Sequence, residues 1–285
     1  MSIIRYKTGE VRLAWRLLII IMLFVAVAVL LRFIPISLYT AFLTSSGMAQ
    51  ETALTNAKAI VFEDPAWSMV IGILNGLLSL PLVWFLIKVV ERRSFAWKTV
   101  GLDWKRNSLS ALAFGALLAL LMYVGSQLVG HAFSSPIPSV NIVLAGLSVP
   151  IVIQNFAHYL AMGFGEEVVF RGYVQSRLVE RYGAPWGILI ASVTFTLLHL
   201  GFMSLSPVTI FSAVMLWVTI GALYHWSKSL YLVGMFHGMA NTLLNTLHLE
   251  DTEVGGLIVH ALALLLVIIV ALYRSRASNV RSNPT

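Results

Sequence analysis

Residues 17–38 read LLIIIMLFVAVAVLLRFIPISL, a continuous apolar run with one charged side chain, Arg32. A helix of about 20 apolar residues is long enough to cross the hydrocarbon core of a bilayer, which is roughly 30 Å thick. Seven further apolar runs follow, at residues 67–88, 109–130, 140–163, 185–200, 207–225, 230–248 and 255–273. The sequence therefore predicts a polytopic membrane protein with about eight transmembrane helices.

The composition agrees with a membrane protein and favours an all-α fold. Of the 285 residues, 59% are hydrophobic and 11% are charged, whereas soluble domains carry roughly 25% charged residues. The runs are continuously apolar and do not alternate, which favours helices over the strands of an outer-membrane barrel. We expect N-terminal membrane helices at residues 1–140, a helical core at residues 141–249, and a C-terminal membrane helix with a cytoplasmic tail at residues 250–285.

Basic residues are distributed asymmetrically between the predicted loops. If consecutive loops alternate between the two sides of the membrane, 17 Lys and Arg residues fall on one side and Lys58 alone on the other. The positive-inside rule then places both termini in the cytoplasm and the loop acids Glu51, Glu63 and Asp64 outside. Cytoplasmic loops that face anionic lipid headgroups explain the net charge of +7, so we expect the bilayer and no nucleic acid as a partner.

Two adjacent carboxylates and an arginine stand out in the sequence GFGEEVVFR at residues 163–171. Charged side chains inside a membrane are costly and mark functional sites. On a helix, Glu167 and Arg171 are four residues apart and can pair on one face. Glu166 lies about 100° away around the helix and is left free for a different role. Gly163 and Gly165 allow a neighbouring helix, or an extended substrate, to approach closely.

Two histidines follow in segments that are otherwise apolar. His199 comes four residues after Phe195, and His237 comes four residues before Asn241, so each pair shares a helix face. Each group also has a purely structural interpretation. The carboxylates and the arginine could form a buried ion pair, His199 could be a core histidine, and His237 with Asn241 could form an interhelical hydrogen bond. Their joint occurrence favours a single site.

The spacing around one turn predicts which of these groups meet. Gly183 and Pro185 mark the turn; Glu166 lies 17 residues before Gly183, and His199 lies 14 residues after Pro185. At about 1.5 Å per residue their depths differ by only about 5 Å. We therefore expect a long helix over residues 145–182 and an antiparallel hairpin that places the carboxylate beside the imidazole.

A carboxylate beside a neutral imidazole can take a proton from water, and His or Asn can stabilise an oxyanion, so the chemistry indicated is hydrolysis. The chain has no Gly-x-Ser-x-Gly or His-Glu-x-x-His sequence. The absence of cysteine excludes thiolate nucleophiles, disulfides and cysteine-ligated zinc. We expect no cofactor; if a divalent metal such as zinc is bound, its expected ligands are Glu166, His199 and His237.

The motifs Glu-Glu-x-x-x-Arg, Phe-x-x-x-His and His-x-x-x-Asn, in this order on successive membrane helices, resemble the CAAX protease and bacteriocin-processing (CPBP, Abi) family, in particular its type II CAAX prenyl endopeptidase-like members. They read here as Glu166-Glu167 with Arg171, Phe195 with His199, and His237 with Asn241. RGYVQ at residues 171–175 and FTLLHL at residues 195–200 also match the sequences that usually surround these motifs in the family. The resemblance covers roughly residues 145–248.

This resemblance implies an intramembrane endopeptidase. In it, Glu166 and His199 would activate water, and His237 and Asn241 would form the oxyanion hole. Glu167 and Arg171 would support the site. The implied substrate is a membrane-associated protein or peptide, which in eukaryotic members is a prenylated CAAX protein that loses its last three residues; many bacterial members have other substrates. We expect the cell membrane of a prokaryote as the location.

Two other classes of function remain open at the level of sequence. One is a non-catalytic membrane scaffold or bacteriocin self-immunity protein that keeps the architecture of the site. The other is a proton-coupled transporter, because intramembrane Glu and His relay protons, although no repeat symmetry is visible. The remaining histidines, His158, His225, His248 and His260, fit no motif and are interpreted as structural, and the tryptophans as interfacial anchors or packing residues. The sequence predicts no oligomeric state.

Overall fold

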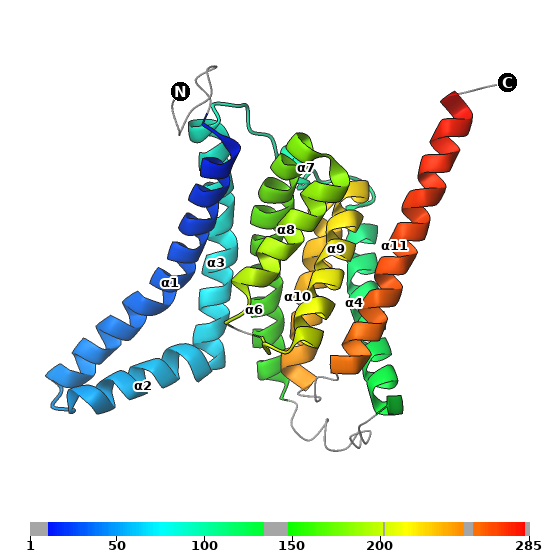
Figure 1. Cartoon of the computed structure of the whole chain (residues 1–285). Coiled ribbons are helices and arrows are strands. Elements are labelled where there is room, and N and C mark those ends of the chain that lie inside the picture. Colours follow the sequence, from blue (N-terminus) through cyan, green and yellow to red (C-terminus); the bar gives the residue numbers. More distant parts are fainter. Residues whose placement is uncertain (1–10, 134–147, 202, 248–252, 283–285) are drawn as a thin grey trace.

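The computed structural model describes residues 11–133, 148–201, 203–247 and 253–282, and the fold within these ranges is all-helical, as predicted (Figure 1). Five of the described helices are long and apolar enough to cross a membrane: Leu13–Ser45, Pro65–Val90, Ser108–Phe133, Pro207–Ser227 and Glu253–Arg274. Ala184–Leu198 is apolar but shorter. The number of about eight spans stays a prediction, and residues 140–147 and 248 of the predicted runs lie outside the described residues.

The N-terminal helices form an open triangle on one side of the bundle (Figure 1). Helix α1 (Leu13–Ser45) slants away from α3 (Pro65–Phe85), and α2 (Gln50–Glu63) returns from the far end of α1 to α3. The prediction that Glu51 and Glu63 lie in a loop is wrong, because both belong to α2. Ala53, Ala57 and Val61, spaced four residues apart, form the buried face of α2, and this helix packs against α1.

The connection from α3 to α4 (Ser108–Phe133) is partly helical. A π-helical segment, η1 (Leu86–Val90), extends α3, and a short 3₁₀ turn, η2 (Trp97–Val100), follows it. Helix α6 (Val149–Glu167), the π-helical segment η3 (Val168–Gln175) and α7 (Ser176–Tyr182) then run without a break. The described part of the predicted long helix is thus continuous from residue 149 to residue 182.

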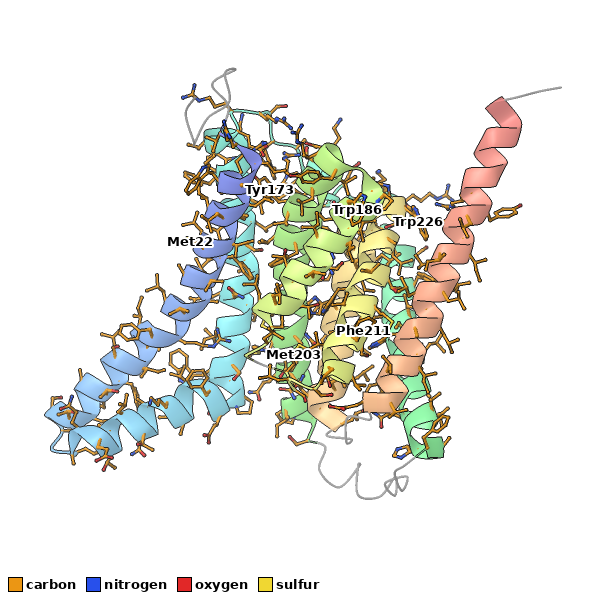
Figure 2. All side chains as sticks on the ribbon, in the orientation of Figure 1. Met22, Tyr173, Trp186, Met203, Phe211 and Trp226 are labelled. Atoms are coloured by element: carbon orange, nitrogen blue, oxygen red, sulfur yellow. The ribbon has the colours of Figure 1, made fainter. Side chains whose placement is uncertain are left out.

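A tight turn at Gly183, where φ is +78°, separates α7 from α8 (Ala184–Leu198). Helices α9 (Pro207–Ser227), α10 (Leu230–Leu247) and α11 (Glu253–Ser282) complete the described chain. Trp186 and Trp226 lie toward the same end of the bundle as Tyr173, whereas Met203 and Phe211 lie toward the other end (Figure 2). The turn therefore produces the antiparallel hairpin that the spacing of Gly183 and Pro185 predicts.

Glycines bring the central helices into close contact. Helix α6 packs against α3 and α10, and α10 also packs against α4. A Cβ atom on Gly163 would lie 2.8 Å from the backbone nitrogen of Gly238 on α10, and one on Gly165 would lie 2.6 Å from the Cα atom of Gly76 on α3. The approach predicted at Gly163 and Gly165 is therefore an approach of helices.

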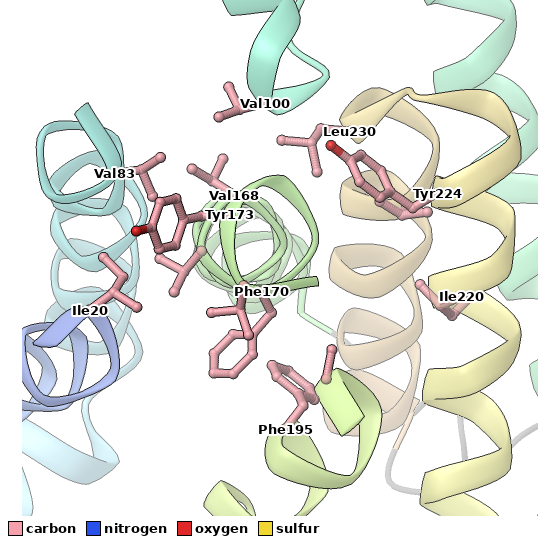
Figure 3. Packing of buried hydrophobic residues seen from close by; sticks show 14 of the residues in the cluster. Ile20, Val83, Val100, Val168, Phe170, Tyr173, Phe195, Ile220, Tyr224 and Leu230 are labelled. Atoms are coloured by element: carbon pink, nitrogen blue, oxygen red, sulfur yellow. The ribbon is translucent and has the colours of Figure 1, made fainter. Parts of the chain in front are cut away.

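The hydrophobic core surrounds η3 (Figure 3). Phe170 and Val168 project from this segment toward side chains of neighbouring helices, among them Val83 of α3 and Phe195 of α8. All eight residues of η3 are buried. The charged residues next to and inside η3 are therefore shielded from bulk solvent by packed apolar side chains.

Candidate active site

The two adjacent carboxylates end α6 and the arginine lies inside η3. The side chains of Glu167 and Arg171 are both 0% exposed, and Arg171 Nε lies 3.3 Å from Glu167 Oε2. The structure thus brings together the pair expected from the four-residue spacing. π-Helical turns are rare and are frequently found at functional sites, and this one holds the arginine at the centre of the bundle.

Glu166 faces a different set of groups from Glu167. Its Oε2 atom lies 3.8 Å from Nε2 of His199, the C-cap residue of α8. The Nδ1 atom of His199 lies 2.8 Å from the carbonyl oxygen of Phe195. Because a carbonyl only accepts, Nδ1 carries the proton of this hydrogen bond, and Nε2 is the ring atom that faces the carboxylate. The expected proximity of carboxylate and imidazole is present.

His237 of α10 contacts both carboxylates. Its Nδ1 atom donates a hydrogen bond to Glu167 Oε1 over 3.0 Å, and its Nε2 atom lies 3.6 Å from Glu166 Oε2. A carboxylate on Nδ1 fixes the orientation of an imidazole ring and the position of its proton. Glu167 therefore orients His237 as well as pairing with Arg171. The contact between Glu167 and His237 joins α6 to α10, and the spacing of residues within one helix does not predict it.

Asn241 lies one turn after His237 on α10, and both residues line the same cavity. This cavity has a volume of about 250 Å³ and is enclosed by side chains from α4, α9, α10 and α11. His199 also lines it, whereas the carboxylates and Arg171 do not. The cavity thus gives a ligand access to the side of the site that carries the imidazoles and the Asn241 amide.

Trp217 of α9 belongs to the site although no motif contains it. Its ring centroid lies 4.9 Å from that of His237 and 4.5 Å from that of Phe195. The guanidinium carbon of Arg171 lies 5.0 Å from the centre of the Phe195 ring and 5.3 Å from the centre of the Trp217 ring. Such aromatic faces stabilise a cation. The chain contains eight tryptophans, and sequence alone does not distinguish this one.

The charge of Arg171 is compensated mainly by these neighbours. Within the described ranges, its Nη1 and Nη2 atoms are buried and have no hydrogen-bond partner. The carboxylate of Glu167 and the two aromatic rings supply the favourable electrostatic contacts. Removing any one of them leaves a buried charge with fewer partners.

A second buried ionic cluster anchors the end of the same helix. The side chain of Glu91, directly after η1, is 1% exposed. It accepts hydrogen bonds from Arg177 of α7 at 2.7 Å, from Arg16 of α1 at 2.7 Å and from the Tyr173 hydroxyl of η3 at 2.9 Å. Burial alone would raise the pKa of Glu91, but hydrogen bonds and charges from Arg177, Tyr173 and Arg16 outweigh it and lower the pKa.

The metal alternative stays a prediction. Among the residues that the structure describes, no group of three or more His, Cys, Asp or Glu is found that could hold a metal ion. In the set expected to ligate a divalent metal, Nε2 of His199 and Nε2 of His237 lie 3.8 and 3.6 Å from Oε2 of Glu166.

Comparison with known families places these residues in one segment. Residues 148–243 match the family model described as Type II CAAX prenyl endopeptidase Rce1-like. This segment is Rce1-like. It begins at the N-cap of α6 and ends inside α10, so it contains all six of the polar residues singled out from the sequence, Glu166, Glu167, Arg171, His199, His237 and Asn241.

The match confirms the predicted family resemblance and supports a peptidase fold in a membrane protein. The Rce1-like segment covers 96 of the 285 residues, and α1 to α4 and α11 lie outside it. Neither the search of curated proteins nor the search of solved structures found a significant match.

Proposed function

We propose that this protein is an intramembrane endopeptidase that hydrolyses a peptide bond of a membrane-associated protein or peptide. The observation that carries the proposal is the convergence of His199 Nε2 and His237 Nε2 on Oε2 of Glu166, at 3.8 and 3.6 Å. These separations exceed a direct hydrogen bond, and Oε2 is buried without a hydrogen-bond partner among the described residues, which leaves it to accept from a water molecule. His199, His237 and Asn241 line a cavity of about 250 Å³ in which part of a substrate could be bound.

In the proposed reaction, Glu166 acts as general base and takes a proton from the attacking water, while His199 Nε2 accepts a hydrogen bond from the same water. The water oxygen then bonds to the carbonyl carbon of the scissile peptide. The resulting oxyanion receives hydrogen bonds from Asn241 Nδ2 and, when His237 carries a proton on Nε2, from His237. The proton held by Glu166 passes to the leaving amine, which completes the hydrolysis.

Glu167 and Arg171 are proposed as positioning residues. Glu167 fixes the His237 ring through Nδ1, and Arg171 balances the charge of Glu167. The orientation with both termini in the cytoplasm, predicted from the loop charges, remains part of the proposal. The substrate class is taken from the Rce1-like segment, whose family acts on CAAX proteins.

The experiment compares cells that express the unsubstituted protein with cells that express Glu166→Gln or His199→Ala. Protein termini in the isolated membranes are identified by mass spectrometry. We expect new termini that depend on the unsubstituted protein and disappear in both variants. Glu51→Gln, which changes an exposed carboxylate on α2, serves as the matched control and should cut normally. Cleavage by the Glu166 or His199 variant at the normal rate would refute the proposal.

A further inference from the structure

The cavity beside the proposed active site continues to a second polar pair. Ser212 of α9 and His260 of α11 both line it, and the Ser212 hydroxyl lies 2.7 Å from Nδ1 of His260. The other side chains that line the cavity are largely apolar and include Leu216, Met122 and Leu244. His260 lies outside the Rce1-like segment, which ends at residue 243. The cavity therefore joins the proposed chemistry to a part of the chain that the family match does not cover.

His260 has one ring nitrogen to offer to a ligand. Its Nδ1 atom is taken by Ser212, and in the part of the chain that the structure describes Nε2 has no hydrogen-bond partner. The side chain is half-buried within a helix that is apolar enough to span a membrane. A polar group left unpaired in such surroundings costs free energy unless a partner reaches it. The cavity provides the route by which a partner arrives.

The distance along α9 fits a peptide chain. Ser212 precedes Trp217 by five residues, which corresponds to about 7.5 Å of helix. Trp217 packs against His237 and Ser212 contacts His260, so a peptide that runs along α9 passes from His237 to the Ser212–His260 pair over about this rise. An extended peptide rises about 3.3 Å per residue. A peptide that lies in the cavity with its scissile bond at His237 therefore places a residue about two positions away beside His260.

We propose that Ser212 and His260 form a subsite that hydrogen-bonds the backbone of an unwound, apolar peptide segment about two residues from the bond that is cut. This inference rests on the proposed endopeptidase function. An intact substrate helix satisfies its own backbone groups and offers His260 no partner. The subsite is therefore specific for a membrane peptide whose helix is interrupted near the cleavage position.

Gly256 of α11 provides a matched pair of substitutions in the same wall. A Cβ atom there would lie 3.6 Å from Ser212 Oγ and 3.9 Å from His260 Cε1, which is ordinary van der Waals contact. Alanine is accommodated, whereas the larger side chain of leucine projects from this position into the cavity. Gly256→Leu thus narrows the proposed subsite, and Gly256→Ala controls for the loss of glycine.

The test uses full-length protein in proteoliposomes of phosphatidylethanolamine and phosphatidylglycerol. The probes are synthetic Leu/Ala transmembrane peptides with a central Gly-Pro interruption and one diazirine-bearing leucine, moved one residue at a time along the series. Cross-links are mapped by mass spectrometry in the Glu166→Gln background, which holds a peptide without cutting it. Thermal unfolding confirms that each variant is folded.

We expect the peptide to cross-link to α9 and α11 near Ser212 and His260. These cross-links should persist in Gly256→Ala and disappear in Gly256→Leu. His260→Ala should weaken peptide binding by about five- to tenfold, the equivalent of one hydrogen bond, and His260→Gln should restore part of it. Cross-links confined to α1 to α3, no cross-link to α9 or α11, or binding unchanged by Gly256→Leu would overturn the subsite.

Cleavage of the same peptides by the unsubstituted protein separates this inference from the proposed function. A peptide that cross-links at α9 and α11 but is never cut supports the subsite and contradicts the endopeptidase. A peptide that is cut at the same rate and with the same KM by His260→Ala and Gly256→Leu contradicts the subsite and leaves the endopeptidase standing.

Discussion

Glu167 and His237, 70 residues apart in the chain, are joined by a hydrogen bond of 3.0 Å between Oε1 and Nδ1. The other oxygen of Glu167 lies 3.3 Å from Nε of Arg171. One buried carboxylate therefore sets the orientation of a histidine in the proposed active site and compensates a buried arginine at the same time. Its substitution should affect both stability and catalysis.

We predict that Glu167→Gln lowers the free energy of unfolding by about 3–5 kcal/mol, because it leaves the charge of Arg171 buried without its carboxylate. The double variant Glu167→Gln/Arg171→Met should recover most of this stability, yet it should not recover peptide cleavage, because His237 loses its carboxylate partner. Chemical denaturation in detergent micelles and a cleavage assay measure the two effects. If Glu167→Gln is as stable as the unsubstituted protein, Glu167 does not compensate the buried charge of Arg171.

Trp217→Phe should keep most of the stability and activity, whereas Trp217→Ala should lose both. The aromatic face over Arg171 and His237 survives in the first variant, whereas the second removes a large, half-buried ring at a cost below the about 3–5 kcal/mol of a fully buried one. Trp186→Ala is the matched control, since Trp186 is 63% exposed. A Trp217→Ala variant that cuts as fast as the control contradicts a role in the site.

Gly238→Ala should separate α6 from α10. Its Cβ atom would come within 2.6 Å of the Cα atom of Leu160, and neither backbone can yield without moving a helix. The hydrogen bond between Glu167 and His237 should lengthen, and both the thermal midpoint and the cleavage rate should fall. Gly125→Ala, whose Cβ atom would meet nothing closer than 3.6 Å, should behave as the unsubstituted protein does. Normal activity of Gly238→Ala would show that the helices tolerate the shift.

The Glu91 cluster should make stability depend on acid pH. The folded-state pKa of Glu91 lies below its ordinary value of 4.5, so its stabilisation is present above pH 4.5 and is lost as the pH falls through the folded-state pKa. Between pH 6 and pH 3 the free energy of unfolding of the unsubstituted protein should decrease. The decrease should be smaller in Glu91→Gln. An identical pH dependence in the two proteins would contradict the assignment.

The predicted orientation can be measured without a background reaction, because the chain contains no cysteine. Thr52→Cys places a single thiol on exposed α2, and Asn107→Cys places one in the exposed connection before α4. A membrane-impermeant maleimide added to intact cells should label the first variant, and only permeabilised cells should show labelling of the second. The reverse pattern would place the termini on the opposite side.

The sequence is sufficient to predict contacts that follow from helix geometry. Glu167 and Arg171 pair because they are four residues apart, and Glu166 meets His199 because similar lengths of helix flank the turn at Gly183. The all-helical class follows from the length and continuity of the apolar runs. These predictions depend only on distances along the chain and on the constant rise of an α-helix.

Contacts between distant helices could not be predicted in this way. Trp217 and His260 belong to no motif, and Glu91 appears in the sequence as part of a polar connection although its side chain is buried. Helix α2 was not predicted, because its 14 residues are too few and too polar for a membrane span and only Ala53, Ala57 and Val61 are buried. Each of these features depends on which helices pack together, and that information does not reside in local spacing.

The π-helical segment between Glu167 and Ser176 also sets a constraint on chain length. Each π-type bond encloses one more residue than an α-type bond, so this stretch holds one residue more than an α-helix with the same number of turns. Deleting a single residue would let the wide turn close into an α-helix and leave everything after it in its present orientation relative to Glu166. Arg177 would keep its contact with Glu91, whereas the side chains inside the segment, Arg171 among them, would lose the positions that the wide turn gives them. The extra residue therefore serves the side chains inside the segment, and the contact between Arg177 and Glu91 does not depend on it.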